Sequence, residues 1–254
     1  MPLADTSRPT VSHGRTISPA RSLTTVVWVP RAPGRRSLVV FAPGFDVGPD
    51  AYAALLASWA AHGYVVAAPE FPLSDPAVAG ADLDEADINN QPGDVRFVTD
   101  ALVAAGSQVA ALVDPSRVAV AGHSDGAEAA LAAGVTPVPV GQPRYRAVIA
   151  MSAQQVTVAG ETANPPLLVT QGDADTINPP SYGYTTWQHA NSPKYLLVLH
   201  GGGHLPPLQP GSVWLAGIEA VSVAFLDTYV AGDGPAAGIG SALPGSALFQ
   251  LRAG

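Results

Sequence analysis

The amino-acid sequence predicts an α/β fold in which a mostly parallel sheet carries helices on both faces. Short apolar runs bounded by Gly, Pro or Asp alternate along the chain with segments whose apolar residues recur at helical spacing. Strands that alternate with helices pair in parallel, because each helix returns the chain to the edge of the sheet where the strands begin. Of the 254 residues, 47% are hydrophobic and 13% are charged, so we expect a large core and a single domain over residues 1–254.

The N-terminal part begins with a polar segment, residues 1–22, for which we expect irregular structure. A β-rich run at residues 24–29 predicts an edge strand, and the run at 37–42 predicts a more buried strand. Asp50 is placed to cap a helix that reaches His62. The inner face of this helix is predicted from four residues at helical spacing: Tyr52, Leu55, Leu56 and Trp59.

A third strand is expected at residues 65–68, followed by a long acidic loop at 70–93. Loops of this length inside a compact domain are typically functional. Asp94 is expected to open a helix that ends near Leu112. The inner stripe of this helix is predicted from its apolar residues: Val95, Val98, Leu102, Val109 and Leu112.

The centre of the chain carries the pattern Gly122-x-Ser124-x-Gly126, between an apolar run at residues 118–121 and an Ala-rich run. A buried strand before the motif and a helix after it are the context of a nucleophile elbow, the tight turn that exposes a catalytic serine. Glycine is required on both sides because any side chain there would clash. The N–H groups at the start of the helix can then stabilise an anion beside the Ser124 hydroxyl.

The second half of the chain continues the alternation after a Pro-rich connection at residues 135–144. The expected strands lie at residues 147–151, 167–170 and 195–199, and the expected helices at 182–189 and 213–230. The Gly- and Ala-rich tail, residues 231–254, is expected to be irregular and to pack on the body of the protein.

A serine nucleophile needs a base that accepts its proton and a carboxylate that orients the base. On folds with this elbow, the acid and then the histidine follow the serine in the chain. Asp173 and Asp175 follow the strand at 167–170, and His204 follows the strand at 195–199. Both segments leave the carboxyl ends of strands, where the ligand sites of open α/β sheets lie.

The chain resembles the α/β-hydrolase superfamily over residues 24–230. It is most similar to the lidless carboxylesterase branch, which includes cutinase-like and platelet-activating-factor-acetylhydrolase-like serine hydrolases. The resemblance is carried by four motifs in the family's order: Pro43-Gly44-Phe45, Gly122-His-Ser-Asp-Gly126, Gly172-Asp-Ala-Asp175-Thr-Ile-Asn-Pro179 and Gly203-His204. It implies a catalytic triad of Ser124 as nucleophile, Asp175 as acid and His204 as base.

The family pattern also implies an oxyanion hole, for which the candidate donors are the backbone N–H groups of Phe45 and Asp125. Two positions depart from this pattern: Asp125 stands where a smaller or apolar residue is usual, and Ala127 stands where a glycine is common. The Asp125 carboxylate has two possible roles. It either points aside and interacts favourably with the positive end of its helix, or it raises the pKa of His204 or repels the oxyanion.

Other polar residues near these motifs have competing interpretations. Asp173 is the alternative acid, although the second residue of such a turn is better placed to bond local backbone N–H groups. His200 is expected to be packed or satisfied at the end of its strand, and His123 is expected to shape the elbow. His200 and His204 are separated by three glycines rather than held on a helix, so we expect no metal site.

Phe45 and Trp187 are the candidates for the walls of a substrate pocket. Trp187 lies near the acid loop in sequence and faces either the substrate or the core, and Tyr52 has the same two alternatives. About 15 residues separate Met151 from Leu167, which leaves no room for an inserted lid domain.

These motifs together predict a serine carboxylic-ester hydrolase that works through an acyl-enzyme on Ser124 and needs no cofactor. The expected substrates are short-chain or accessible esters, including polyester-like polymers. An acyltransferase or a serine peptidase on the same fold is the alternative. A binding protein without catalysis is a weaker alternative, because all three triad positions are occupied.

The charge balance restricts the partners of the protein. With 12 Lys and Arg against 20 Asp and Glu, the net charge is -8 and no basic run is present, so nucleic acid and anionic membranes are not expected partners. No apolar run approaches the length of a membrane span. The first residues lack the basic and apolar regions of a signal peptide, and the resemblance is compatible with secretion after removal of a leader. We expect a monomer.

Overall fold

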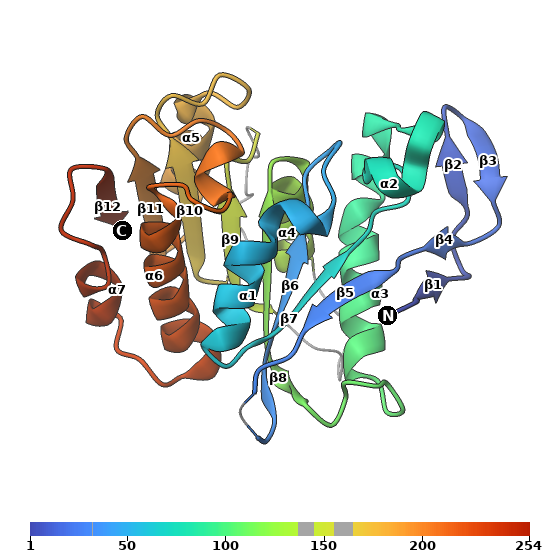
Figure 1. Cartoon of the computed structure of the whole chain (residues 1–254), viewed down its shortest axis with the longest axis horizontal. Helices are drawn as coiled ribbons and strands as arrows, with labels where there is room; N and C mark the ends of the chain where they lie inside the picture. Colours follow the sequence, from blue (N-terminus) through green and yellow to red (C-terminus); the bar gives the residue numbers. More distant parts are fainter. Residues whose placement is uncertain (32, 137–144, 155–164) are drawn as a thin grey trace.

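The computed structural model describes residues 1–31, 33–136, 145–154 and 165–254. Its centre is an eight-stranded sheet with the order β12-β11-β10-β9-β8-β6-β7-β5, flanked by helices (Figure 1). The strands pair in parallel except for the two edge strands, since β5 is antiparallel to β7 and β12 is antiparallel to β11. The predicted α/β-hydrolase fold is confirmed.

The strands of this sheet are, in chain order, β5 (Thr25–Trp28), β6 (Arg36–Ala42), β7 (Val65–Pro69), β8 (Val113–His123), β9 (Tyr145–Met151), β10 (Leu167–Gly172), β11 (Lys194–Leu199) and β12 (Phe249–Ala253). The α-helices are α1 (Ala53–Ala61), α2 (Pro76–Ala79), α3 (Gln91–Val103), α4 (Asp125–Val135), α5 (Pro180–His189), α6 (Leu215–Leu226) and α7 (Ala237–Ser241). Short 3-10 turns occur at η1 (Pro49–Tyr52), η2 (Gly80–Asp82), η3 (Glu85–Asn89) and η4 (Pro206–Leu208), and a π-helical turn, η5 (Asp227–Ala231), follows α6.

The sheet separates two apolar layers. Along β6, Leu38, Val40 and Ala42 face one layer, and Val39 and Phe41 face the other, as the period of two in a strand requires. Helices α3, α4 and α5 cover the first layer, and α1 and α6 cover the second. Strand β8 lies near the middle of the sheet between β6 and β9, so the segment that follows it emerges at the centre of the molecule.

The N-terminal segment differs from the expectation of irregular structure over residues 1–22. It forms four short strands that pair in two small sheets, β1 (Ala4–Asp5) with β4 (Arg21–Ser22) and β2 (Thr10–Ser12) with β3 (Arg15–Ser18). The segment lies against the part of the chain that carries η3 and α3 (Figure 1). Buried ion pairs of Arg21 with Asp87 and Asp94 hold the segment in this position, and they join residues that are far apart in sequence.

The C-terminal tail also differs from the expectation for residues 231–254. It contains α7 and then β12, which covers the otherwise open edge of β11 in an antiparallel register from Tyr195–Ala253 to Leu199–Phe249. An uncovered edge strand exposes backbone donors and acceptors, and pairing with β12 satisfies them. The expected strands and helices between residues 24 and 230 are present, with shifted ends.

Two helix starts are corrected. Asp50 does not cap α1, because it lies inside the preceding 3-10 turn and the N-cap position of α1 is taken by Tyr52, which makes no capping bond through its side chain. Asp94 does not open α3, which begins at Gln91 and ends at Val103. The Pro-rich connection expected at 135–144 lies mainly outside the described residues. No helix in the described part of the chain has both the length and the apolar character to cross a membrane.

Candidate active site

The turn between β8 and α4 places Ser124 at the carboxyl end of the central strands. Ser124 has φ 55° and ψ -126°, a conformation that L-residues rarely adopt and that strains the backbone. A Cβ added to Gly122 would lie 2.1 Å from the carbonyl oxygen of Gly126, and one added to Gly126 would lie 2.0 Å from that of Ala42. Glycine is therefore required at both positions, as the sequence pattern predicts, and the turn projects the serine out of the sheet.

Asp175 and His204 come together from two neighbouring loops. The Asp175 Oδ2 atom lies 2.8 Å from His204 Nδ1, and the Asp175 Oδ1 atom accepts backbone N–H bonds of 2.9 Å from Ile177 and Asn178. Asp175 is only 4% exposed. Burial alone would raise the pKa of this carboxyl, but the hydrogen bonds from His204 and the two backbone N–H groups lower it overall.

Two amide side chains that sequence reasoning missed hold the acid loop in place. Gln171 Nε2 donates to the carbonyl oxygen of Asn178 at 3.0 Å and approaches Asp175 Oδ2 at 3.4 Å. Asn178 Nδ2 donates to the carbonyl oxygen of Ser152 at 2.7 Å. A glutamine at the end of the apolar run of β10 is the sequence signal that could have indicated this role, because a buried amide needs partners.

Asp173 makes a second pair with a histidine, away from Ser124. Its Oδ2 atom lies 2.7 Å from His200 Nδ1, and its Oδ1 atom accepts a 2.6 Å bond from the N–H of Gly201. The side chains of Asp173 and His200 are 40% and 43% exposed, whereas those of Asp175 and His204 are 0% and 11% exposed. Asp173 was expected to bond local backbone, but the backbone N–H that it accepts from belongs to Gly201, 28 positions away in the loop after β11.

Ser124 and His204 line a pocket of about 290 Å³. Phe45 and Asp125 line the same pocket, so both residues assigned to the oxyanion hole lie beside the serine. Asp125 is the first residue of α4, where a backbone N–H has no acceptor within the helix. The remaining wall includes Val47, Ile177 and Leu205 among its apolar residues.

Trp187 does not line this pocket, which corrects one of the two candidates for its walls. It packs against the apolar layer on the α5 side of the sheet, with Lys194 Nζ 5.2 Å from the centre of its ring. Helix α5 begins at Pro180, and seven residues of helix advance the chain by about 10 Å. The helix therefore carries Trp187 away from the acid loop that precedes it in sequence.

His123 takes part in a buried hydrogen-bond network that joins both sides of the site. Its Nε2 atom lies 3.1 Å from the carbonyl oxygen of His204, and its Nδ1 atom lies 2.8 Å from the hydroxyl of Tyr52. The N–H of Gly44 donates to that same hydroxyl at 3.2 Å. Gly44 precedes Phe45, so the network connects the oxyanion loop to the backbone of His204.

The hydrogen-bond partners of His123 determine which of its ring nitrogens carries the hydrogen. A carbonyl oxygen only accepts hydrogen bonds, so His123 Nε2 carries the hydrogen and Nδ1 accepts from Tyr52. Burial, together with the nearby His204, lowers the pKa of His123 to about 3. His123 is therefore neutral at ordinary pH, which agrees with a shaping role in the elbow. Tyr52 is fully buried and belongs to the core.

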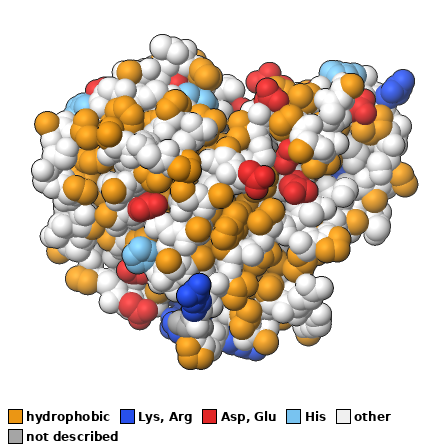
Figure 2. Space-filling model, viewed as in Figure 1, with side chains coloured by type: hydrophobic (Ala, Val, Ile, Leu, Met, Phe, Trp, Pro, Cys, Tyr) orange, Lys and Arg blue, Asp and Glu red, His pale blue; other side chains and the backbone are white. Residues whose placement is uncertain are grey.

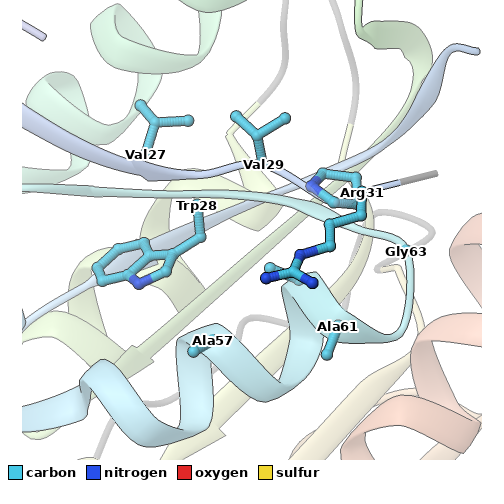
Figure 3. A pocket seen from close by; sticks show the side chains of 9 residues that line it. Val27, Trp28, Val29, Arg31, Ala57, Ala61 and Gly63 are labelled. Atoms are coloured by element: carbon cyan, nitrogen blue, oxygen red, sulfur yellow. The ribbon is translucent and has the colours of Figure 1, made fainter. Parts of the chain in front are cut away.

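A second, larger hollow of about 920 Å³ lies between the edge strand β5 and α1. Trp28 points from β5 toward the helix that carries Ala57 and Ala61, and Val27 and Val29 point to the other face of the strand (Figure 3). The hollow contains neither a nucleophile nor an acid–base pair. Within the described residues, no group of three or more His, Asp or Glu side chains is arranged to hold a metal ion.

The fold and the site define a class of protein. A strained serine on a strand-to-helix turn shares one pocket with a histidine that is oriented by a buried aspartate, on an α/β-hydrolase sheet. The family model of chlorophyllase matches residues 4–180, and the chain belongs to this family of α/β-hydrolase-type esterases. The more specific likeness to cutinase-like or platelet-activating-factor-acetylhydrolase-like enzymes has no support from this match. A search of curated proteins gave no significant match.

Proposed function

We propose that the protein is a serine carboxylic-ester hydrolase that forms an acyl-enzyme on Ser124. The observation that carries this proposal is the buried contact of 2.8 Å between Asp175 Oδ2 and His204 Nδ1, in a pocket that also contains the strained Ser124. Because Nδ1 is bonded to the carboxylate, Nε2 of His204 is the atom left to accept a proton. Membership of the chlorophyllase family supports ester hydrolysis as the reaction.

The proposed reaction has two half-reactions. His204 removes the proton of Ser124, the serine oxygen attacks the ester carbonyl, and the N–H groups of Phe45 and Asp125 hold the oxyanion. His204 then gives the proton to the departing alcohol. Water, deprotonated by His204, attacks the acyl-enzyme, and His204 returns that proton to the Ser124 oxygen as the acid is released. Asp175 keeps His204 in the tautomer that these steps need.

The size and exposure of the pocket favour short-chain or otherwise accessible esters. A volume of about 290 Å³ is at the lower end of the range for small-molecule sites. Ile177, at the rim, is 67% exposed and offers an apolar contact to a substrate that stays partly outside. An accessible chain of a polyester could present its ester bond in the same way.

A chain-length series of aryl esters tests the function and the acyl preference together. We expect turnover of short acyl chains, with one fluorophosphonate incorporated per active protein and none in Ser124→Ala. Chlorophyll, the substrate that the family name gives, and an insoluble polyester film complete the series. Product esters formed on addition of an alcohol would indicate acyl transfer instead. A protein that neither hydrolyses any ester nor reacts with the probe would refute the proposal.

A further inference from the structure

The pocket beside Ser124 carries charge of only one sign. Its charged wall residues are Asp46, Glu85 and Asp125, and no Lys or Arg is among the described residues that line it. A group of acidic side chains is visible in the upper half of Figure 2, whereas most of the visible Lys and Arg side chains lie along the lower edge. The net charge of -8 adds to this local field.

Asp125 is buried without a full set of partners. It is 3% exposed, and its Oδ2 atom has no hydrogen-bond partner among the described residues. Glu128, one turn further along α4, has a buried Oε1 atom that also lacks a partner there. Burial and the neighbouring carboxylates raise the pKa of Asp125 to about 6 and that of Glu128 to about 7. Buried carboxylate oxygens normally have a hydrogen-bonding partner, and among the described residues Asp125 Oδ2 and Glu128 Oε1 have none.

We propose that this pocket binds the cationic group of an ester substrate, a protonated amine or a quaternary ammonium, against Asp125 with Glu85 and Asp46. The inference rests on the proposed esterase function and names the substrate class of the same site. Asp125 directly follows the nucleophile, so a cation held there lies near the ester carbonyl. The positive charge of the bound cation also offsets the repulsion between these carboxylates and the oxyanion that forms during attack.

An organic cation fits the pocket better than a metal ion. Metal sites need several ligand atoms that converge on one point, and the described residues contain no such group of three. An ammonium group needs only a cavity with a negative wall and apolar surface around its carbon atoms. Val47, Ile177 and Leu205 supply that surface next to the acidic residues.

The test compares two thioesters of the same shape, acetylthiocholine and 3,3-dimethylbutyl thioacetate, which differ in the charge of one atom. For the wild-type protein we expect kcat/KM to be at least about tenfold higher for the cationic thioester, and this ratio to fall as salt is added. Choline is expected to inhibit hydrolysis of the neutral thioester competitively.

Variants locate the effect. Asp125→Asn and Glu85→Gln should each reduce the ratio of the two kcat/KM values toward one. Asp233→Asn, which removes an exposed carboxylate that does not line the pocket, should leave the ratio unchanged. The backbone N–H of Asp125 is assigned to the oxyanion hole, so Asp125→Asn can lower activity on both thioesters. Such a general loss affects both kcat/KM values equally and does not change their ratio.

Two results would overturn the inference and leave the esterase proposal intact: equal turnover of both thioesters by the wild-type protein, or an unchanged ratio in both pocket variants. Both results require that the neutral thioester is hydrolysed and that Ser124 reacts with a fluorophosphonate. If neither thioester is hydrolysed and Ser124 is unreactive, the proposed function fails, and the inference fails with it.

Discussion

Tyr52 and His123 form a hydrogen-bond network behind the proposed catalytic site. The Tyr52 hydroxyl accepts from the N–H of Gly44 and donates to His123, which in turn donates to the carbonyl oxygen of His204. Each donor in this series of hydrogen bonds has one acceptor. Removal of the Tyr52 hydroxyl therefore leaves the N–H of Gly44 and the Nδ1 atom of His123 buried without a partner. The network therefore couples the proposed oxyanion loop to the loop of the proposed base.

Tyr52→Phe tests this coupling. We expect kcat to fall about tenfold with KM nearly unchanged, because the substrate still binds but the loop of the oxyanion hole is less well held. Steady-state kinetics on a short aryl ester measures both constants. Tyr64→Phe is the matched control, since Tyr64 is also buried but its hydroxyl bonds Asp227 outside the pocket. If the two variants lose kcat equally, Tyr52 has only a structural role.

The sequence predicted that Ser124, Asp175 and His204 lie at one edge of the sheet, because each follows the carboxyl end of a recognisable apolar strand. In the structure Ser124 and His204 line one pocket and Asp175 contacts His204. The network of Tyr52 and His123 could not be read in the same way, since its members are 71 positions apart and meet only through the order of the strands. Trp187 was misplaced because nearness in sequence to the acid loop does not persist along a helix.

At the scale of elements, the N-terminal strands are held by an ion-pair network without solvent access. The Arg21 side chain on β4 bonds Asp87 in η3 and Asp94 in α3, and all three side chains are 0% exposed. Arg8 adds a bond of 2.7 Å to Asp94. The network fixes η3, whose first residue, Glu85, lines the pocket.

Arg21→Met should destabilise the protein by about 3–5 kcal/mol, because it leaves the buried Asp87 without its ion-pair partner and Asp94 with Arg8 as its remaining one. Urea unfolding followed by circular dichroism measures this change. Arg117→Met is the control, because Arg117 pairs with Asp114 at 3.4 Å on the surface and its loss should change stability by at most about 1 kcal/mol. Equal effects in the two variants would contradict the importance of the buried network.

This network also explains why helix ends were predicted less well than helices. Asp94 has the residue type of an N-cap, but its carboxylate is used by Arg21, which lies 73 positions away. The apolar stripe of α3 was predicted correctly for Val95, Val98 and Leu102, and the helix ends before Gly106, which has φ 94°. β12 was missed although its residues alternate between apolar and polar, because the Gly-rich sequence before it favoured an irregular tail.

At the scale of the whole molecule, an excess of acidic groups makes stability depend on pH. Burial, with the charges of Asp125 and Glu85, raises the pKa of Glu128 to about 7 from an ordinary value of 4.5. Between these two values the folded protein binds a proton that the unfolded chain has lost. The free energy of unfolding therefore decreases as pH rises through this range.

Glu128→Gln should remove part of this dependence. We expect the variant to gain stability relative to the wild-type protein at pH 8 but not at pH 4.5, where the wild-type carboxyl is already protonated in the folded state. The measurement is the urea midpoint at both pH values. Asp82→Asn, which removes an exposed carboxylate in the acidic segment at residues 70–93, should show no such difference. A gain of equal size at both pH values would contradict the proton linkage.

The assignment of the triad as a whole is tested most directly by two aspartates that lie two residues apart. Asp175 is buried and bonds His204, whereas Asp173 is exposed and bonds His200. The measurement is kcat on one aryl ester for Asp175→Asn and Asp173→Asn, both shown to be folded by circular dichroism. We predict a loss of about 10⁴ for Asp175→Asn and less than about tenfold for Asp173→Asn. A folded Asp175→Asn variant that keeps its activity, beside an inactive Asp173→Asn, would contradict the account.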